Sequence, residues 1–452
     1  MISVFKGSWP LYLGMFMLMV GNGLQGTLLG LRADVEGFST FAISIVMSAY
    51  FLGFLFGSRL TPKLIRAVGH VRVFAALGSM VSAVLILYPT LVDPIAWTVG
   101  RVIIGFCFCG VYITAESWLN DAATNETRGL SLSIYMIVQM GGIVLAQYIV
   151  SLGDVSGFVL FIIPSVFVSL AFAPILLVKR TQPEFGQTKP MSVPDLVRAS
   201  PLASVGMFLM GGVFAAQFGM SAVYASRVGL SVAEVSLFVS AIYISALILQ
   251  FPIGWLSDRI DRRLLIIGVS IIGGAGSFIA LMSESLWPIV ISGAIVGGMS
   301  NPLYALLIAY ANDYLEKDDM AAASGGLLFV NGVGAIAGPL FLGWMMETIG
   351  NWGYWAFLAA LQIGIACYAV FRMTRRSRTD FEIENAPYVP LAASGTAVAA
   401  EFAQEVYLDT EYYEHKTYDE FAEEAEADTD ETAQAEDATL TQTTQEPSDA
   451  QR

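Results

Sequence analysis

Long apolar stretches separated by short polar connections make up the first 373 residues of the chain. Stretches of about 18 to 25 apolar residues are long enough to cross a hydrocarbon core of about 30 Å as helices. Twelve of them can be distinguished, near 9–30, 40–58, 73–91, 96–118, 130–152, 157–178, 202–224, 233–255, 264–283, 287–311, 322–346 and 353–373. The pattern predicts an all-α integral membrane protein with twelve transmembrane helices.

Two parts of the chain repeat each other at an offset of 192 residues. Gly14-Met15-Phe16 recurs as Gly206-Met207-Phe208, Gln25 as Gln217, and Asn120-Asp121 as Asn312-Asp313. We therefore expect two pseudo-symmetric six-helix halves at 1–178 and 202–378, a cytoplasmic linker at 179–201 and a tail at 379–452. Two related halves around one axis leave a cleft between them, an arrangement that is typical of transporters.

Composition and charge placement support a membrane protein and orient it. Hydrophobic residues make up 56% of the sequence and charged residues 13%, whereas charged residues reach about a quarter of a soluble protein. Lysine and arginine concentrate in the connections after the even-numbered segments, for example Arg59, Lys63 and Arg66 after the second. By the positive-inside rule, these connections and both termini are expected in the cytoplasm.

The predicted tail has a different composition from the rest of the chain. Residues 379–452 contain 20 acidic and 2 basic side chains, whereas residues 1–378 contain 18 acidic and 21 basic ones. Such a segment buries too little apolar surface to fold alone, so we predict a disordered acidic cytoplasmic tail. Its aromatic residues offer a docking motif for a cytoplasmic partner, and a solvated extension without a specific role is the alternative.

Residues that carry enzyme chemistry are scarce. Cys107, Cys109 and Cys367 all fall inside predicted helices, and His70 and His415 are the only histidines. The chain has no metal-ligand spacing, no nucleophile elbow and no glycine-rich phosphate loop. The sequence therefore predicts no enzyme, no metal, no cofactor and no nucleic-acid partner.

The connection between the eighth and ninth segments carries the sharpest motif, Gly254-Trp-Leu-Ser-Asp258-Arg259-Ile-Asp261-Arg262-Arg263. A carboxylate among arginines at a helix end can pair with them and with the N-terminus of a neighbouring helix. We expect a cytoplasmic gate, formed by Gly254, Asp258, Arg259, Arg262, Arg263 and, from the first half, Arg128. The equivalent loop at 57–72 keeps the glycines and basic residues but lacks an aspartate, so its arginines serve either this gate or the positive-inside rule alone.

The motif resembles the signature loop of the major facilitator superfamily, GxLxDRxGRR, with Asp261 where glycine is usual. Ser48-Ala-Tyr50-Phe51-Leu-Gly53, Arg101-Val-Ile-Ile-Gly105 and Leu327-Leu328-Phe329-Val-Asn331 further resemble the YcaD-like bacterial group of that superfamily. The resemblance covers about residues 9–373. It implies a transporter fold, a bacterial inner membrane and a central cavity lined by the first, fourth, seventh and tenth helices.

Two charged residues share one face of the fourth segment, Arg101 toward the outer end and Glu116 toward the cytoplasmic end. A charge inside an apolar helix is costly unless it is paired or hydrated, so each is a functional candidate. Arg101 is a candidate counter-ion for an anionic substrate or, alternatively, a clamp to a neighbouring helix end. Glu116 is a candidate proton-coupling site or, alternatively, the partner of Arg128 or another gate arginine in a salt bridge.

The remaining candidates are polar and uncharged. Amides and hydroxyls spaced along a mostly apolar cavity suit a modest-sized ligand with hydrogen-bonding groups, although helix-to-helix hydrogen bonds use the same residues. On this basis, and with Arg101, the predicted substrate-binding residues are Asn22, Gln25, Tyr112, Gln217, Tyr224, Asn301 and Tyr304.

These features together predict a secondary active transporter. It would move a small organic molecule across the inner membrane by alternating access, coupled to an ion gradient with the proton as the expected ion, and as a monomer. Export of apolar compounds is the alternative within this class. An alternative of another class is a transporter-derived sensor that signals through the acidic tail.

Overall fold

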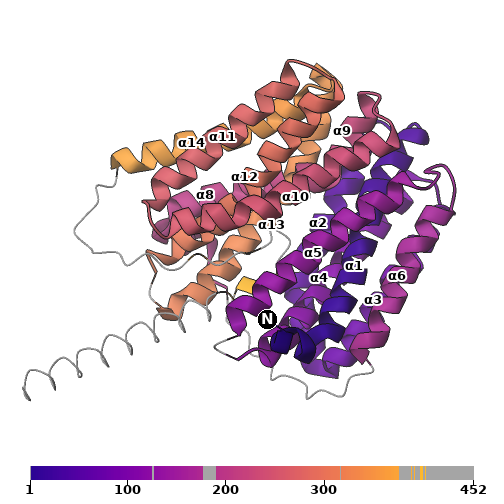
Figure 1. Ribbon diagram of the computed structural model, residues 1–452, viewed down its shortest axis with the longest axis horizontal. Coiled ribbons are helices and arrows are strands. Elements are labelled where there is room, and N and C mark those ends of the chain that lie inside the picture. Colours follow the sequence, from indigo (N-terminus) through magenta and orange to yellow (C-terminus); the bar gives the residue numbers. More distant parts are fainter. Residues whose placement is uncertain are drawn as a thin grey trace, which may run out of the picture. The chain divides into compact units, whose positions relative to one another are not determined.

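Twelve long apolar helices form the described part of the protein (Figure 1). The computed structural model describes residues 2–124, 127–176, 190–315, 317–375, 388, 391, 396, 398–400 and 403, all within one compact unit, Met1–Gln404. These residues form helices and no strands, and each of the twelve is long and apolar enough to cross a membrane. The predicted all-α integral membrane fold is therefore confirmed.

Each span overlaps one predicted segment, and the largest difference is in the second, where the helix continues to Val68 instead of ending near residue 58. The first half contains α1 (Ile2–Val35), α2 (Thr40–Val68), α3 (His70–Leu87), α4 (Pro94–Ala122), α5 (Arg128–Ser151) and α6 (Val159–Leu176). In the second half the seventh span consists of α8 (Pro201–Ala215), the π-helix η1 (Ala216–Met220) and α9 (Ser221–Arg227). It is followed by α10 (Val232–Ser257), α11 (Arg262–Leu281), α12 (Leu286–Asn312), α13 (Lys317–Ile349) and α14 (Gly353–Arg375).

The sequence analysis did not predict the short helix α7 (Val193–Ala199), which lies in the expected linker. Its boundaries have a local cause, because the Ser192 side chain accepts a hydrogen bond from the Asp195 N–H and proline occupies the first turn. The same device starts α4, where Asp93 accepts hydrogen bonds from the backbone of Ile95 and Ala96. The domain boundaries at 178, 201 and 378 stay predictions.

The two halves pack in the same way internally. α2 contacts α4 as α10 contacts α12, and α1 contacts α5 as α8 contacts α13. Between the halves, α2 packs against α13 and α5 against α10, and the latter pair lies side by side in Figure 1. These two interfaces are equivalent under the 192-residue repeat, because α10 corresponds to α2 and α13 to α5.

Two faces of the bundle are used as references below. α1 ends and α2 begins at the far face, near residues 34–40. α2 ends and α3 begins at the terminal face, near residues 68–70, which is also the face where α14 ends. The first residue of α3, His70, is buried.

Close contact between α2 and α4 depends on glycine. A Cβ atom on Gly53 would lie 1.9 Å from the Val102 carbonyl oxygen, and one on Gly105 would lie 1.9 Å from the Tyr50 carbonyl oxygen. Both obstacles are backbone atoms, so a side chain at either position would force the two helices apart. These helices carry Tyr50, Arg101 and Tyr112, and their separation therefore determines the geometry of the candidate site.

We expect Gly53→Ala to destabilise the protein by about 1–3 kcal/mol, the usual cost of overpacking a close contact. Gly268→Ala on α11 is the matched control, because a Cβ at Gly268 meets no atom within 4 Å. Thermal unfolding of both variants in detergent measures the difference. Equal midpoints for the two variants would show that α2 and α4 have room to separate.

Seven described residues of the predicted tail lie against the bundle rather than away from it. Leu391, Thr396, Ala399, Ala400 and Ala403 are each at most 5% exposed. Residues 404–452 lie outside the described residues, and the disorder of the tail stays a prediction.

Candidate functional site

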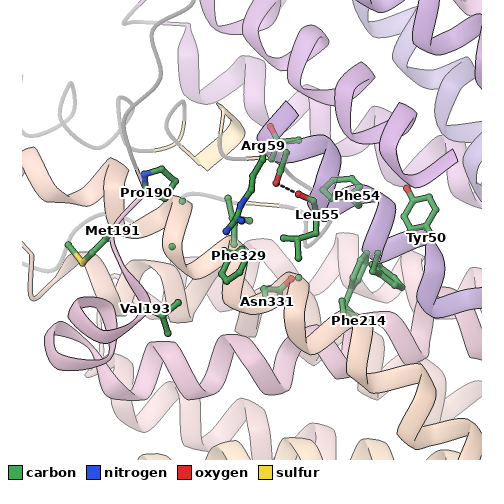
Figure 2. Close-up of a pocket in the computed structure, with 18 of the residues that line it drawn as sticks. Tyr50, Phe54, Leu55, Arg59, Pro190, Met191, Val193, Phe214, Phe329 and Asn331 are labelled. Carbon is green, nitrogen blue, oxygen red and sulfur yellow. Dashed lines mark hydrogen bonds between the residues drawn. The ribbon is translucent and has the colours of Figure 1, made fainter. Parts of the chain in front are cut away.

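A cavity of about 520 Å³ lies between the two halves (Figure 2). Most of its wall comes from α2 and α13: Figure 2 shows Tyr50, Phe54, Leu55 and Arg59 on one side and Phe329 and Asn331 on the other. The Arg59 guanidinium lies 4.5 Å from the centre of the Phe329 ring, a cation–π contact that joins the halves. Exposed Arg59 and Lys63 and residues 190–193 border the cavity toward the terminal face.

A second, smaller cavity of about 30 Å³ adjoins the first. Asn22, Phe214 and Phe218 line both cavities and therefore form the partition between them. The two phenyl rings stack with their centres 5.9 Å apart, and Tyr50 packs against Phe218 at 5.4 Å. The partition is thus a cluster of aromatic rings with one amide.

The four helices expected to line the central cavity together line only the small cavity. The small cavity takes Asn22 from α1, Tyr112 from α4, Gln217 from the seventh span and Asn301 from α12. The larger cavity is lined mainly by the second and eleventh spans instead. The helical period of a sequence shows which face of each helix is polar. It does not show which helices border the cavity between the two halves.

Hydrogen bonds connect four of the predicted residues in the first half. Arg101 donates to Gln25 Oε1 at 2.6 Å, and Gln25 donates to Asn22 Oδ1 at 3.0 Å. Asn22 donates in turn to the Tyr112 hydroxyl at 2.7 Å. All four residues are buried. The network holds the Asn22 amide at the wall of both cavities.

Arg101 is a buried cation that no carboxylate balances within the described part of the chain. Besides Gln25, its guanidinium contacts Met47 Sδ at 3.3 Å and lies 4.9 Å from the centre of the Tyr50 ring. Its Nε has no hydrogen-bond partner among the described residues. An amide and an aromatic face compensate only part of the cost of burying a charge. Arg101 lines neither cavity and lies behind Gln25 and Tyr50.

The corresponding region of the second half is polar but uncharged. Gln217 and Gln362 both donate to Ser300 Oγ, at 3.1 and 2.9 Å, and Asn301 donates to Gln250 Oε1 at 2.7 Å. Gln217 lies in η1, a π-helical turn of a kind that is frequent at functional sites. Its counterpart one repeat earlier, Gln25, lies in the regular α1. The buried charge of the first-half network therefore has no counterpart in the second half.

Tyr224 and Tyr304 do not line either cavity. Tyr224 stacks on Tyr354, with ring centres 4.7 Å apart, and packs edge-on against Trp355. Tyr304 is buried within α12. A substrate-binding role for these two residues stays a prediction.

Glu116 is buried toward the terminal-face end of α4. The Tyr135 hydroxyl donates to its Oε1 at 3.0 Å, and the Thr396 hydroxyl donates to its Oε2. Both donors are neutral, and they come from α5 and from the chain beyond α14. Proton coupling and pairing with a gate arginine both stay predictions for this residue.

Arg262 is the buried centre of the predicted gate. It forms an ion pair with Asp313 at the end of α12, donates to Ser257 Oγ at 3.1 Å and lies 3.9 Å from Asp258 Oδ1. The motif therefore joins α10, α11 and α12, which all belong to the second half. Asp261, where glycine was expected, accepts a hydrogen bond from the Arg263 N–H at 2.9 Å and so caps α11.

The other gate candidates have separate surroundings. Arg259 lies on the surface, 4.1 Å from the centre of the Trp255 ring. Arg128 begins α5 in the first half. Gly254 and Asp258 face Tyr388, which lies beyond α14. A gating role for the set stays a prediction.

The first half places His70 at the position of Arg262, one repeat earlier. Its Nε2 lies 3.1 Å from Ser117 Oγ on α4, whereas Arg262 reaches Asp313 on α12. The basic position at the start of the third helix of each half is thus kept, with a weaker base in the first half.

Contacts between the halves close the far face. Asp34 at the end of α1 forms an ion pair with Arg227 at the end of α9, with 2.8 Å between Oδ1 and Nε, and it accepts a hydrogen bond from Ser226. Arg227 also donates to the Phe38 carbonyl at 2.7 Å, and Glu347 on α13 accepts the Phe41 N–H at 2.9 Å. We call Asp34, Ser226, Arg227 and Glu347 the far-face seal.

The sequence analysis missed the far-face seal. The 192-residue repeat nevertheless carries a signal for it. Asp34 and Ser226 are one repeat apart, so a twofold arrangement brings them to the same axis. No cluster of three or more metal-ligating side chains occurs among the residues that the structure describes.

Two related helical halves, with a large cavity between them and contacts that join them at one face, are the architecture of a membrane transporter. The chain matches the Major Facilitator Superfamily over residues 11–232 and again over residues 202–403, and it belongs to this family. It is therefore a multi-pass bacterial membrane transporter rather than an enzyme, as the sequence predicts.

Relatives and solved structures agree with this assignment. An uncharacterized transporter of the same superfamily, YcaD of Salmonella arizonae, is 26% identical over 74% of this chain and 87% of its own length. The nucleoside transporter NupG has a similar fold, with a TM-score of 0.68 and 17% identity over 81% of this chain and 99% of its own. The Escherichia coli fucose:proton symporter FucP has a TM-score of 0.54 and 15% identity over 82% and 99%.

Proposed function

We propose that this protein is a secondary active transporter that moves a small organic molecule by alternating access. The observation that carries the proposal is the large cavity between the halves, which reaches the terminal face while the far-face seal joins the halves at the opposite face. Rocking of one half against the other would break this seal and close the cavity from the terminal side. The conformation described here is then one of the two end states.

The terminal face is assigned to the cytoplasm of a bacterial cell whose inner membrane holds the protein. Arg59, Lys63 and Arg66 lie in the last three turns of α2 and Arg72 lies in the first turn of α3, all toward that face, in keeping with the positive-inside rule. The far-face seal then faces the periplasm, and the cavity is open inward.

The substrate is assigned as an organic anion with an apolar body. Arg59 and Lys63 are the only charged residues among the described residues that line the large cavity, and both are cations. Five phenylalanines and a tyrosine supply the apolar wall. A volume near 520 Å³ suits a drug-sized molecule held by a few polar groups. Export of uncharged apolar compounds is the second candidate, favoured by the same aromatic wall.

An unbiased metabolite screen tests the substrate class. Purified protein is screened by thermal shift, and each compound that stabilises it is followed into proteoliposomes for uptake with and without an imposed pH gradient. We expect carboxylates or phosphates with a ring or alkyl body to bind, and neutral analogues to bind at least about tenfold more weakly. Stabilisation by neutral apolar compounds alone would favour the second candidate.

Proton coupling is assigned to Glu116, the one described carboxyl group buried between helices near the cavity and bound by neutral donors. The titratable groups that interact with it are Tyr135 on α5, Cys109 on its own helix and Tyr304 on α12. Each of these groups is neutral when protonated, and no described cation pairs with Glu116. A proton bound at Glu116 would therefore neutralise an unbalanced negative charge. FucP, a fucose:proton symporter with a similar fold, supports this coupling by analogy.

We expect Glu116→Gln to remove the dependence of uptake on an imposed pH gradient while substrate exchange between equal concentrations continues. Glutamine keeps the size and one oxygen acceptor of the side chain but binds no proton. Glu284→Gln is the matched control, because Glu284 is exposed in the connection between α11 and α12 at the far face. Gradient-driven uptake that is unchanged in Glu116→Gln would leave Glu116 with a structural role alone.

A sensor that signals through the acidic tail is the alternative of another class. Deleting residues 405–452 removes most of the tail acids and none of the described contacts. Uptake that survives this deletion would argue against the tail as the output of the protein. A partner for the tail and the monomeric state both stay predictions.

A further inference from the structure

We propose that the chain beyond α14 acts as an internal wedge, whose docking on both halves at the terminal face keeps the cavity open to that side. The wedge is defined by Tyr388, Leu391, Thr396, residues 398–400 and Ala403. The inference rests on the proposed alternating access, because only a cavity that must close can be held open.

The buried residues of the wedge share one helical face. Thr396, Ala399, Ala400 and Ala403 follow the spacing i, i+3, i+4 and i+7, and residues 398–400 and 403 are helical. Each of the four is at most 4% exposed. In an undocked tail this apolar face would be exposed to water. Its burial shows that this part of the chain is docked on the helix bundle.

The wedge contacts the second half through Tyr388. The Tyr388 N–H donates to Asp258 Oδ1 at 2.8 Å. The Tyr388 ring packs directly on Gly254, because a Cβ atom at Gly254 would lie only 2.4 Å from the ring carbon Cδ1. Gly254 and Asp258 belong to the terminal-face motif between α10 and α11. The motif therefore provides both a space and an acceptor for the wedge.

The wedge contacts the first half through Thr396. Its hydroxyl donates to Glu116 on α4, and Thr396 also lines the large cavity. Tyr388 and Thr396 are eight residues apart and bind opposite halves. Closing the terminal face would bring α4 and α10 together around this segment, so the wedge has to leave before the halves can close. We infer that docking favours the inward-open state and slows the transport cycle.

Two truncations separate the wedge from the acidic tail. A chain that ends at Gln404 keeps every described wedge contact, whereas a chain that ends at Arg375, the last residue of α14, loses them all. Ala400→Arg in the full-length chain is a third variant, because Ala400 is 2% exposed and a side chain as large as arginine does not fit there without displacing the segment. Spin labels at Arg66 on α2 and Asp319 on α13, both exposed, report the width of the terminal face. Cys367→Ser removes the exposed native thiol, and Cys107 and Cys109 are buried.

We expect the chain ending at Arg375 and the Ala400→Arg variant to shift toward the short terminal-face distance by roughly tenfold in population ratio. The chain ending at Gln404 should match the full-length protein. Unchanged distances in both wedge variants would overturn the inference, as would an equal shift in the chain that ends at Gln404.

A separate variant distinguishes failure of the wedge from failure of alternating access. Asp34→Asn weakens the far-face seal and leaves the wedge intact. If Asp34→Asn widens the far face while the wedge variants change nothing, only the wedge is excluded. If neither alters any distance, the halves do not rock, and the wedge and the proposed function both fail.

Discussion

Replacing Arg262 with alanine is expected to destabilise the protein by about 3–5 kcal/mol, the largest stability effect that we predict for a single residue. The Arg262 and Asp313 side chains form an ion pair and are 1% and 5% exposed. Alanine would remove the cation that pairs with the buried Asp313 carboxylate, and the loss of this ion pair is the main source of the cost. Thermal unfolding in detergent measures the effect.

A double replacement separates the role of this ion pair in stability from its role in gating. Arg262→Met combined with Asp313→Leu removes both charges, and we expect stability to recover to within about 1–2 kcal/mol of the parent. If the pair also serves the gate, the double variant should be stable but slow in transport. Arg259→Ala, on the surface of the same motif, is the control. Equal destabilisation by Arg259→Ala and Arg262→Ala would contradict the buried-pair explanation.

Replacing Arg101 with methionine is expected to separate transport from stability. If Arg101 is the counter-charge for an anionic substrate, uptake of that substrate should fall by roughly 100-fold, the usual consequence of losing a buried charge pair. Stability should hold or rise, because the variant removes a buried cation that no described carboxylate balances. Uptake in proteoliposomes and thermal unfolding are measured on the same preparation.

The alternative role for Arg101, a clamp between helices, has the opposite signature. Loss of its contacts with Gln25 and Met47 would then lower stability and reduce uptake of every substrate alike. Arg72→Met is the matched control, because Arg72 is exposed at the terminal face and lines neither cavity, so its contribution should be small and screened by salt. A stable Arg101→Met protein with full anion uptake would exclude both roles.

The twelve spans could be predicted because lipid offers no hydrogen-bond partners to the backbone, so an apolar segment that crosses it must be helical. Length and hydropathy are then enough to locate each span. The 192-residue repeat predicted the two halves. The packing follows the same repeat, because α2 contacts α4 as α10 contacts α12. Within the site, the chemistry of Asn22, Arg101 and Gln217 was visible as polar positions in apolar helices. Their partners were not, because a sequence shows polarity but not the neighbouring helix.

Three features lay beyond sequence reasoning, each for a physical reason. The π turn at Ala216–Met220 alters hydrogen bonding without altering the hydrophobic period, so no pattern marks it. Under the proposed alternating access, the helices that line the large cavity change with the conformational state, and the sequence does not specify one state. The buried face formed by Thr396 and Ala403 lies in a segment whose overall composition indicates disorder, so the local spacing is masked by the acids around it.

The most direct test of the central claim is to measure both faces of one preparation by spin-label distances. One sample carries labels at Arg66 and Asp319 on the terminal face, and a matched sample carries labels at Val35 and Thr348 on the far face; all four residues are exposed. Ligand or pH is used to change the equilibrium between the conformations of the protein. We predict that one distance lengthens while the other shortens, and that the fraction of molecules that changes is the same at both faces. Distances that change together, or a far-face distance that never lengthens under any condition, would contradict a transporter whose two halves expose one cavity to each side in turn.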